Sequence, residues 1–318
     1  MKKMLFINSN SDMPRCAIFE AGRRYGAAMK LCKEFELEYA EVPADVDKLT
    51  TPLDQYDAVI FNYQHVASSI ISPVVFNQAR VAIGFLYEAR LKPEESPMHF
   101  GDLMAGQLFD IILSPDPTLE TTRRVWSVPR VVPRATHLAN IGNCVFLVST
   151  FGFPSPWKQL GAVVDMLNDE YDEAVFRINF APASWQEDTN LRAVAEGQID
   201  EAQQRCKPGI RIEATNHYMT EESLINWLHE SDVNVFLASP ERGAQTGGAL
   251  LASADLAISA QRPLLISDTV EARHFPSSLR GGFLCESALY SGIVEHLYKL
   301  WSPQNFADAM DKLVRENL

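Results

Sequence analysis

The residues with the clearest capacity for chemistry lie in one polar loop, residues 239–248, which contains the glycines Gly243, Gly247 and Gly248. Glycines just before a helix leave backbone N–H groups open to a ligand, and the positive end of the helix dipole adds to their attraction for an anion. A phosphate-bearing ligand would suit such a loop. The same glycines would also suit a tight turn that binds nothing, and both interpretations stay open at this stage.

The segments on either side of this loop predict the elements that would position it. Residues 233–238 form a short β-branched and aromatic run, as expected of a buried strand. Residues 249–261 are rich in alanine and predict a helix packed against a sheet, which Arg262-Pro263 would end before a strand at 264–267. Two parallel strands joined by a helix place the loop at the carboxyl end of the first strand, where open α/β sheets bind ligands.

Strand-like and helix-like segments alternate along the rest of the chain. The first half predicts strands at 4–8, 37–42, 58–63, 81–87 and 111–113, with helices over 17–33 and from 73 to 78. The second half predicts strands at 144–150, 174–181 and 210–214, with helices over 159–171, 188–206, 221–230 (capped by Thr220), 286–301 and 303–316. This alternation predicts an α/β protein with parallel, doubly wound sheets.

A proline-rich stretch separates the halves. Prolines at 115, 117, 129 and 133 interrupt the periodicity between residues 114 and 139, which predicts a hinge. We therefore expect two Rossmann-like domains, residues 1–139 and 140–318, that face each other across a cleft.

Composition narrows the class of protein. The chain has 318 residues, a net charge of −13 and 47% hydrophobic residues, which is typical of a globular protein and makes nucleic acid an improbable partner. No apolar run reaches the roughly 20 residues of a transmembrane helix, and the start reads as a strand instead of a signal peptide. The five scattered cysteines have no metal-ligand spacing, so we expect a reducing, cytoplasmic environment.

Several segments together resemble a known family, the glycosyltransferases of the GT-B fold, especially the retaining family 4 type. The second half carries most of the resemblance, in residues 146–158 (FLVSTFGFPSPWK), Ser239-Pro240-Glu241, Gly247-Gly248 and 262–267 (RPLLIS). In the first half, residues 16–22 (CAIFEAG) and 57–65 (DAVIFNYQH) are similar to the corresponding loop–helix and strand–loop segments. The predicted helix departs from the family pattern, with Leu256 where a second glutamate is common and Asp255 beside it.

The resemblance implies an activity and an architecture. A GT-B glycosyltransferase moves a sugar from a nucleotide-sugar donor, such as a UDP- or GDP-sugar, to an acceptor hydroxyl without a metal ion or other cofactor. The first domain would hold the acceptor and the second the donor, with the C-terminal helix crossing back to the first domain. The acceptor stays open among glycan, lipid, protein, small metabolite and modified nucleobase.

The resemblance also implies roles on the phosphate side of the site. The leaving diphosphate needs positive charge and N–H donors. Lys158 is the candidate counter-charge, because a lysine at a helix start gains nothing from the helix dipole. Arg15 and Arg242 could assist it, with Gly152 and Ser155 as nearby donors and Thr246, Gly247 and Gly248 as an N–H cradle. Gly152 and Ser155 could equally be plain turn residues.

Sugar and base would be held by other side chains. Glu241 could accept hydrogen bonds from sugar or ribose hydroxyls, and His65 could act as a general base or sugar ligand. His217 could flank the nucleobase. Each has a plainer interpretation as a surface carboxylate or a structural histidine.

Two other functions remain compatible with the sequence. A nucleotide-sugar epimerase of the same fold would need several carboxylates around the sugar, for which the sequence offers only Glu241, with Asp255 or Glu88 as a second. A non-catalytic binding or scaffold protein is the alternative from a different class.

Overall fold

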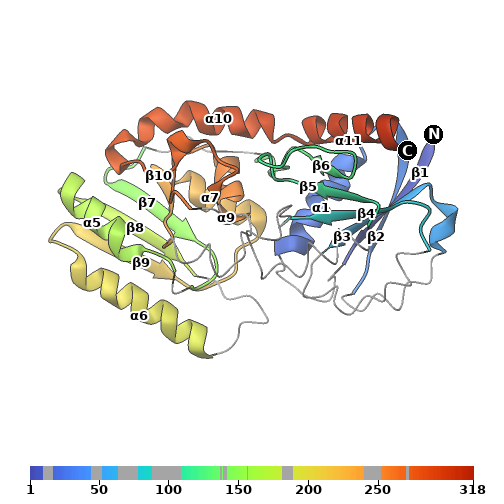
Figure 1. The fold of residues 1–318 in the computed structure, drawn as a ribbon. Helices are drawn as coiled ribbons and strands as arrows, with labels where there is room; N and C mark the ends of the chain where they lie inside the picture. Colours follow the sequence, from blue (N-terminus) through green and yellow to red (C-terminus); the bar gives the residue numbers. More distant parts are fainter. Residues whose placement is uncertain are drawn as a thin grey trace. The chain divides into compact units, whose positions relative to one another are not determined.

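The computed structural model describes residues 1–9, 17–43, 52–63, 78–87, 109–136, 138, 142–155, 157–180, 189–239, 252–269 and 272–318. The chain divides into two compact units, and each has its own parallel sheet (Figure 1). The first unit contains the described residues up to Val131 and residues 300–318, and the second contains those from Val132 to Lys299. The α/β class with parallel sheets is confirmed.

The first sheet has six parallel strands in the order β2-β1-β3-β4-β5-β6. The strands are β1 (Lys2–Asn8), β2 (Phe35–Glu41), β3 (Ala58–Tyr63), β4 (Ala82–Leu86), β5 (Ile111–Ser114) and β6 (Val125–Ser127), and a short 3₁₀ helix spans Leu53–Gln55. Side chains alternate between the faces of the sheet, as the period of a strand requires. Met4 and Phe6 enter one apolar cluster, whereas Leu5 and Ile7 enter another on the opposite face.

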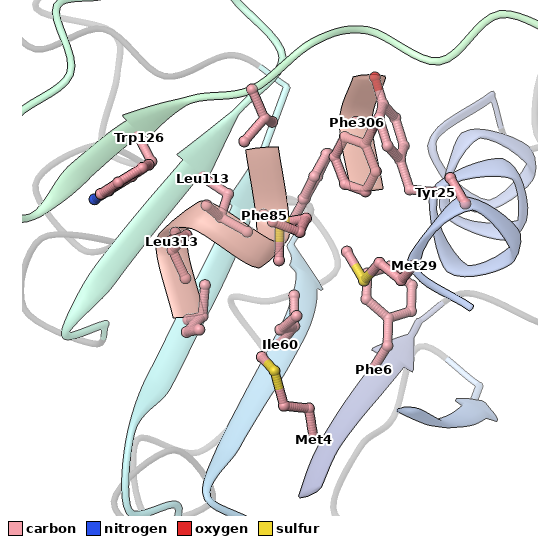
Figure 2. Close-up of a cluster of buried hydrophobic side chains, with 14 of the residues drawn as sticks. Met4, Phe6, Tyr25, Met29, Ile60, Phe85, Leu113, Trp126, Phe306 and Leu313 are labelled. Carbon is pink, nitrogen blue, oxygen red and sulfur yellow. The ribbon is translucent and has the colours of Figure 1, made fainter. Parts of the chain in front are cut away.

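The first of these clusters includes the end of the chain. Helix α1 (Ala17–Met29) and helix α11 (Pro303–Asn317) both pack into it, and Figure 2 shows Phe306 and Leu313 among side chains of the sheet. The helix α11 begins at Ser302, whose hydroxyl accepts a hydrogen bond from Asn305 N at 3.1 Å. The return of the C-terminal helix to the first unit is therefore confirmed.

A buried carboxylate anchors α11 to the first unit. Asp311 is 6% exposed, and its oxygens accept hydrogen bonds from Lys33 N at 2.9 and 3.1 Å and from Glu34 N at 3.0 Å. Arg315 adds an ion pair to Glu34 at 2.9 Å. Backbone N–H groups that follow α1 thus find their acceptor on a helix at the far end of the sequence.

The second sheet has five parallel strands in the order β11-β10-β7-β8-β9. The strands are β7 (Phe146–Phe151), β8 (Ala174–Asn179), β9 (Ile210–Thr215), β10 (Val233–Phe236) and β11 (Leu264–Ile266). The helices are α5 (Leu160–Glu170), α6 (Thr189–Arg205), α7 (Glu221–His229), α9 (Ala252–Ser259) and α10 (Ser291–Leu300), with 3₁₀ segments at Ser277–Leu279 and Leu284–Tyr290. Helices α5 and α6 lie on one side of the sheet, and α7 and α9 lie on the other (Figure 1).

The structure differs from the sequence predictions in the proline-rich stretch. Residues 114–139, whose prolines predict a hinge, also contain β6, which pairs with β5 at the edge of the first sheet. The units divide between Val131 and Val132, within this stretch and ahead of residue 140. The helix expected from residue 73 lies outside the described residues. Among the helices that the structure describes, none has the length and hydropathy that crossing a bilayer requires.

Candidate functional site

The chain order of the second sheet reverses at its central strand, β7. From β7 the chain moves to β8 and β9 on one side, and it then returns to β10 and β11 on the other. Such a reversal opens a crevice at the carboxyl ends of the two strands that diverge, here β7 and β10, because their following loops lead to opposite faces. The segments that leave these strands therefore form the candidate site.

The loop after β7 brings together three of the residues predicted for the site. Gly152 has a φ of +123°, a conformation that side chains other than glycine rarely adopt, and its N–H donates to Asn179 O at 3.1 Å. Ser155 folds the loop, since its carbonyl accepts from Lys158 N at 3.1 Å and its hydroxyl accepts from Trp157 N at 3.4 Å. Ser155 thus acts as a turn residue here.

Backbone hydrogen bonds join this loop to the segment that leaves β10. Lys158 forms an antiparallel bridge with Ala238. Gln159 N donates to Leu237 O at 3.1 Å, and Ser239 N donates to Trp157 O at 2.8 Å. The two sides of the crevice are therefore held at a fixed spacing, with Lys158 between them.

The side chain of Lys158 bends back over the carboxyl end of the sheet. Its Nζ donates to Phe151 O at 3.0 Å and lies 5.2 Å from the centroid of the Phe180 ring, just beyond β8. A Cβ placed on Gly152 would lie 3.4 Å from Nζ, so the glycine keeps that side of the ammonium group uncovered. The cation is held by contacts with two strand ends instead of extending into solvent.

The helix that follows Lys158 adds positive potential at the same place. Helix α5 begins at Leu160, and the side chain of its N-cap residue, Gln159, makes no capping hydrogen bond. The first N–H groups of a helix have no partner within the helix, and they carry the positive end of its dipole. An ammonium group and uncapped helix N–H groups that lie this close in the sequence can together bind a phosphate or diphosphate.

His217 lies apart from this group. It follows β9, the edge strand of the sheet, and its side chain is exposed. The described contacts at that end of the sheet come from other residues: Thr215 donates to Asn179 Oδ1 at 3.2 Å, and Phe180 N donates to Thr215 O at 3.0 Å. None of the described contacts links His217 to Lys158.

The remaining predicted site residues lie outside the described residues. They are Arg15, His65, Glu241, Arg242, Thr246, Gly247 and Gly248. Their proposed roles therefore stay predictions.

Sequence reasoning missed a buried pair at the same end of the second sheet. Asp255, in the first turn of α9, lies 3.4 Å from His274 Nε2, and the side chain of His274 is fully buried. The sequence singles out Asp255 for its position beside Leu256 and as a possible carboxylate of an epimerase, whereas His274 has no motif around it. The imidazole has no access to solvent, and the pair joins α9 to the segment after β11.

A polar network occupies the carboxyl end of the first sheet. Asn8, at the end of β1, donates to Phe19 O at 3.0 Å and to Tyr39 Oη at 2.9 Å, while Asn62 donates to Asn8 Oδ1 at 2.6 Å. A Cβ on Gly22 would lie 2.1 Å from Asn8 Oδ1, so only glycine lets α1 approach this closely. Burial raises the pKa of Tyr39 to about 12. The network fixes the first turn of α1 to the sheet.

Comparison with known proteins identifies the architecture. No family model and no curated protein matches the sequence. Among solved structures, HepE of Anabaena in complex with UDP-glucose matches with a TM-score of 0.55 and 14% identity over 100% of this chain and 97% of that one. The lipopolysaccharide outer core galactosyltransferase WaaB matches with a TM-score of 0.56 and 11% identity, over 99% and 100% of the two chains.

This chain has the GT-B fold. A further solved structure of similar fold is the N-terminal domain of Candida albicans trehalose-6-phosphate phosphatase, with a TM-score of 0.65 and 10% identity over 100% of this chain and 97% of that domain. At such identities the likeness concerns the fold. The GT-B architecture nevertheless agrees with the observed course of the chain, since α11 returns from the second unit to complete the first.

Proposed function

We propose that the protein is a glycosyltransferase that moves a sugar from a nucleotide-sugar donor to an acceptor hydroxyl. The observation that carries this proposal is the Lys158 ammonium, which lies at the chain reversal of the second sheet and beside the uncapped start of α5. A GT-B fold by itself is compatible with other activities. The fixed cation adds the group that a departing diphosphate requires.

The proposed role of Lys158 follows from the charge changes of the reaction. As the bond from sugar to phosphate breaks, negative charge grows on the diphosphate and positive charge grows on the sugar. A cation already held by Phe151 O and the Phe180 ring stabilises that negative charge without first being reorganised. The N–H groups at the start of α5 would share the same phosphate oxygens.

The other proposed roles extend the site around the donor. Glu241 would bind sugar or ribose hydroxyls, His65 would receive the acceptor proton or bind sugar, and the remaining groups would surround the diphosphate and base: Arg15, Arg242, Thr246, Gly247, Gly248 and His217. We propose a uridine nucleotide sugar as the first donor to test. HepE was solved with UDP-glucose, and a trehalose-6-phosphate protein of E. coli of similar fold was solved with UDP-2-fluoro glucose.

Calorimetric titration with UDP and UDP-glucose tests the proposal. We expect Lys158→Ala to weaken UDP binding by roughly tenfold or more, because a charge-assisted hydrogen bond to phosphate is lost. Lys299→Ala is the matched control, since it removes a lysine whose side chain is 71% exposed on α10. Circular dichroism would establish that both variants keep the fold.

Three results would separate the alternatives. Equal UDP affinity of the parent and Lys158→Ala would remove the lysine from the site. Absence of binding by any nucleotide or nucleotide sugar at millimolar concentration would contradict the proposal and favour a scaffold. Consumption of the donor without any acceptor would favour an epimerase or a hydrolase.

A further inference from the structure

A second cavity lies at the other end of the first sheet. Its volume is about 420 Å³, within the range of small-molecule sites. Three of its residues directly precede strands: Val81 before β4, Asp110 before β5 and Arg124 before β6. Ile111, Arg123 and Asn317 complete the described lining. The cavity therefore opens at the amino ends of the strands, whereas ligands of open α/β sheets bind at the carboxyl ends.

One of its arginines is held rigidly. Arg124 Nη2 donates to Phe109 O at 2.9 Å, and Arg124 Nε donates to Asp110 O at 3.4 Å. The Arg124 carbonyl in turn accepts from Ile112 N at 2.7 Å. The guanidinium is thus attached to the start of β5, and its charge stays beside the cavity.

The neighbouring arginine, Arg123, is not held by hydrogen bonds in this way. Arg123 is exposed, and in the described part of the chain it makes no hydrogen bond or ion pair. A protein with 28 basic and 41 acidic residues has enough carboxylates to pair its surface arginines. An unpaired arginine beside a second, fixed arginine therefore makes a local positive site on an acidic protein, and a small anion is its natural ligand.

The remaining lining indicates what kind of molecule would carry the anion. Val81 and the buried Ile111 provide apolar surface. Asp110 is oriented by Ala82 N, which donates to its Oδ2 at 2.9 Å, and a carboxylate in this position can accept hydrogen bonds from hydroxyl groups. Guanidinium groups bind phosphate oxygens through two parallel hydrogen bonds.

We propose that this cavity binds a small hydroxylated organic phosphate, at a site separate from the proposed donor site. Arg123 and Arg124 bind the phosphate, Asp110 accepts hydrogen bonds from the hydroxyl groups, and Val81 and Ile111 contact the carbon skeleton. All of the lining residues that the structure describes belong to the first unit, including Asn317 of α11. Its occupation does not depend on the activity proposed for the second unit.

Glycerol 3-phosphate is a suitable probe, with glycerol as the uncharged control. Calorimetry at low ionic strength is expected to show binding of glycerol 3-phosphate to the full chain, and Arg123→Ala is expected to weaken it roughly tenfold. Because Arg123 is exposed and makes no hydrogen bond or ion pair in the described part of the chain, this variant should keep the parent's melting temperature. Arg192→Ala is the matched control: its side chain is 74% exposed on α6 in the second unit.

The Lys158→Ala variant separates the two sites. Phosphate also suits the proposed donor site, so binding of glycerol 3-phosphate there would be lost in Lys158→Ala and retained in Arg123→Ala. That outcome would overturn the proposal, as would absence of binding at millimolar concentration or an equal loss in Arg192→Ala. The proposal would be supported if glycerol 3-phosphate binding is weakened in Arg123→Ala but not in Lys158→Ala or Arg192→Ala. This conclusion does not depend on the outcome of the nucleotide experiments.

Discussion

Replacement of Gly152 by alanine tests the geometry of the proposed donor site. The φ of +123° lies in a region that an alanine occupies only with strain of about 1–3 kcal/mol. The added Cβ would lie 3.4 Å from Lys158 Nζ, which is ordinary contact, so backbone strain and not a clash is the expected cause of the loss. If the backbone relaxes instead, the hydrogen bond from Gly152 N to Asn179 O is lost, at about 1 kcal/mol.

This cost corresponds to a measurable change in thermal stability. For a unit of this size, each kcal/mol lowers the melting temperature by about 2–4 °C. We also expect weaker UDP binding, because a shifted β7 loop moves the carbonyl of Phe151 that holds Lys158 Nζ. Differential scanning calorimetry and UDP titration measure the two effects on the same sample.

Gly197→Ala provides the matched control. Gly197 lies in α6 with nothing within 4 Å of an added Cβ, so alanine should stabilise the helix by about 0.5–1 kcal/mol. If Gly152→Ala lowers the melting temperature and Gly197→Ala raises it, backbone conformation is identified as the cause, since both changes add the same methyl group to the same unit. A Gly152→Ala variant as stable as the parent and equal to it in UDP affinity would refute the reasoning.

Two remaining predictions concern the first unit. Asp311→Ala leaves the N–H groups of Lys33 and Glu34 without their acceptor and should destabilise the unit by about 2–4 kcal/mol in thermal melts, whereas the exposed Asp308→Ala on the same helix should have little effect. Because burial raises the pKa of Tyr39 to about 12, its stabilising contribution should be complete below pH 10 and lost as the pH rises from about 10 to about 12. The free energy of unfolding, plotted against pH over this range, should fall more steeply for the parent than for Tyr39→Phe. Parallel curves would contradict the prediction.

The elements around the glycine-rich loop show what local sequence can predict. The runs at 233–238 and 264–267 predicted neighbouring parallel strands, and β10 and β11 pair in parallel with Asn234 opposite Leu264. The capping role of Thr220 is also confirmed, since its hydroxyl accepts from Ser223 N at 3.2 Å. In each case the residues that determine the structure lie close together in the sequence. The hydrophobic pattern and the local propensity of these residues therefore favour the same structure.

Features that depend on distant residues could not be predicted in this way. Strand β6 has three residues between prolines, too short for a visible alternation, and it forms because Ile112 and Leu113 of β5 offer it a partner. The pairing of Asp255 with His274 likewise depends on the tertiary fold. Lys158 and its place before a helix were predictable from the sequence, but its contact with Phe180 depends on the neighbouring strand, β8.

The position of α11 has a consequence for how the protein is made. On the ribosome, residues 1–131 are synthesised long before residue 303, so the face of the first sheet that carries Phe85 and Leu113 can pack against α1 but lacks α11 until translation is nearly complete. Residues 300–318 belong to the first unit, so that unit cannot be complete before the whole chain has been released. We therefore expect that the first unit does not finish folding ahead of the second, unlike the usual N-terminal-first order, and that part of its apolar sheet face stays exposed in nascent chains.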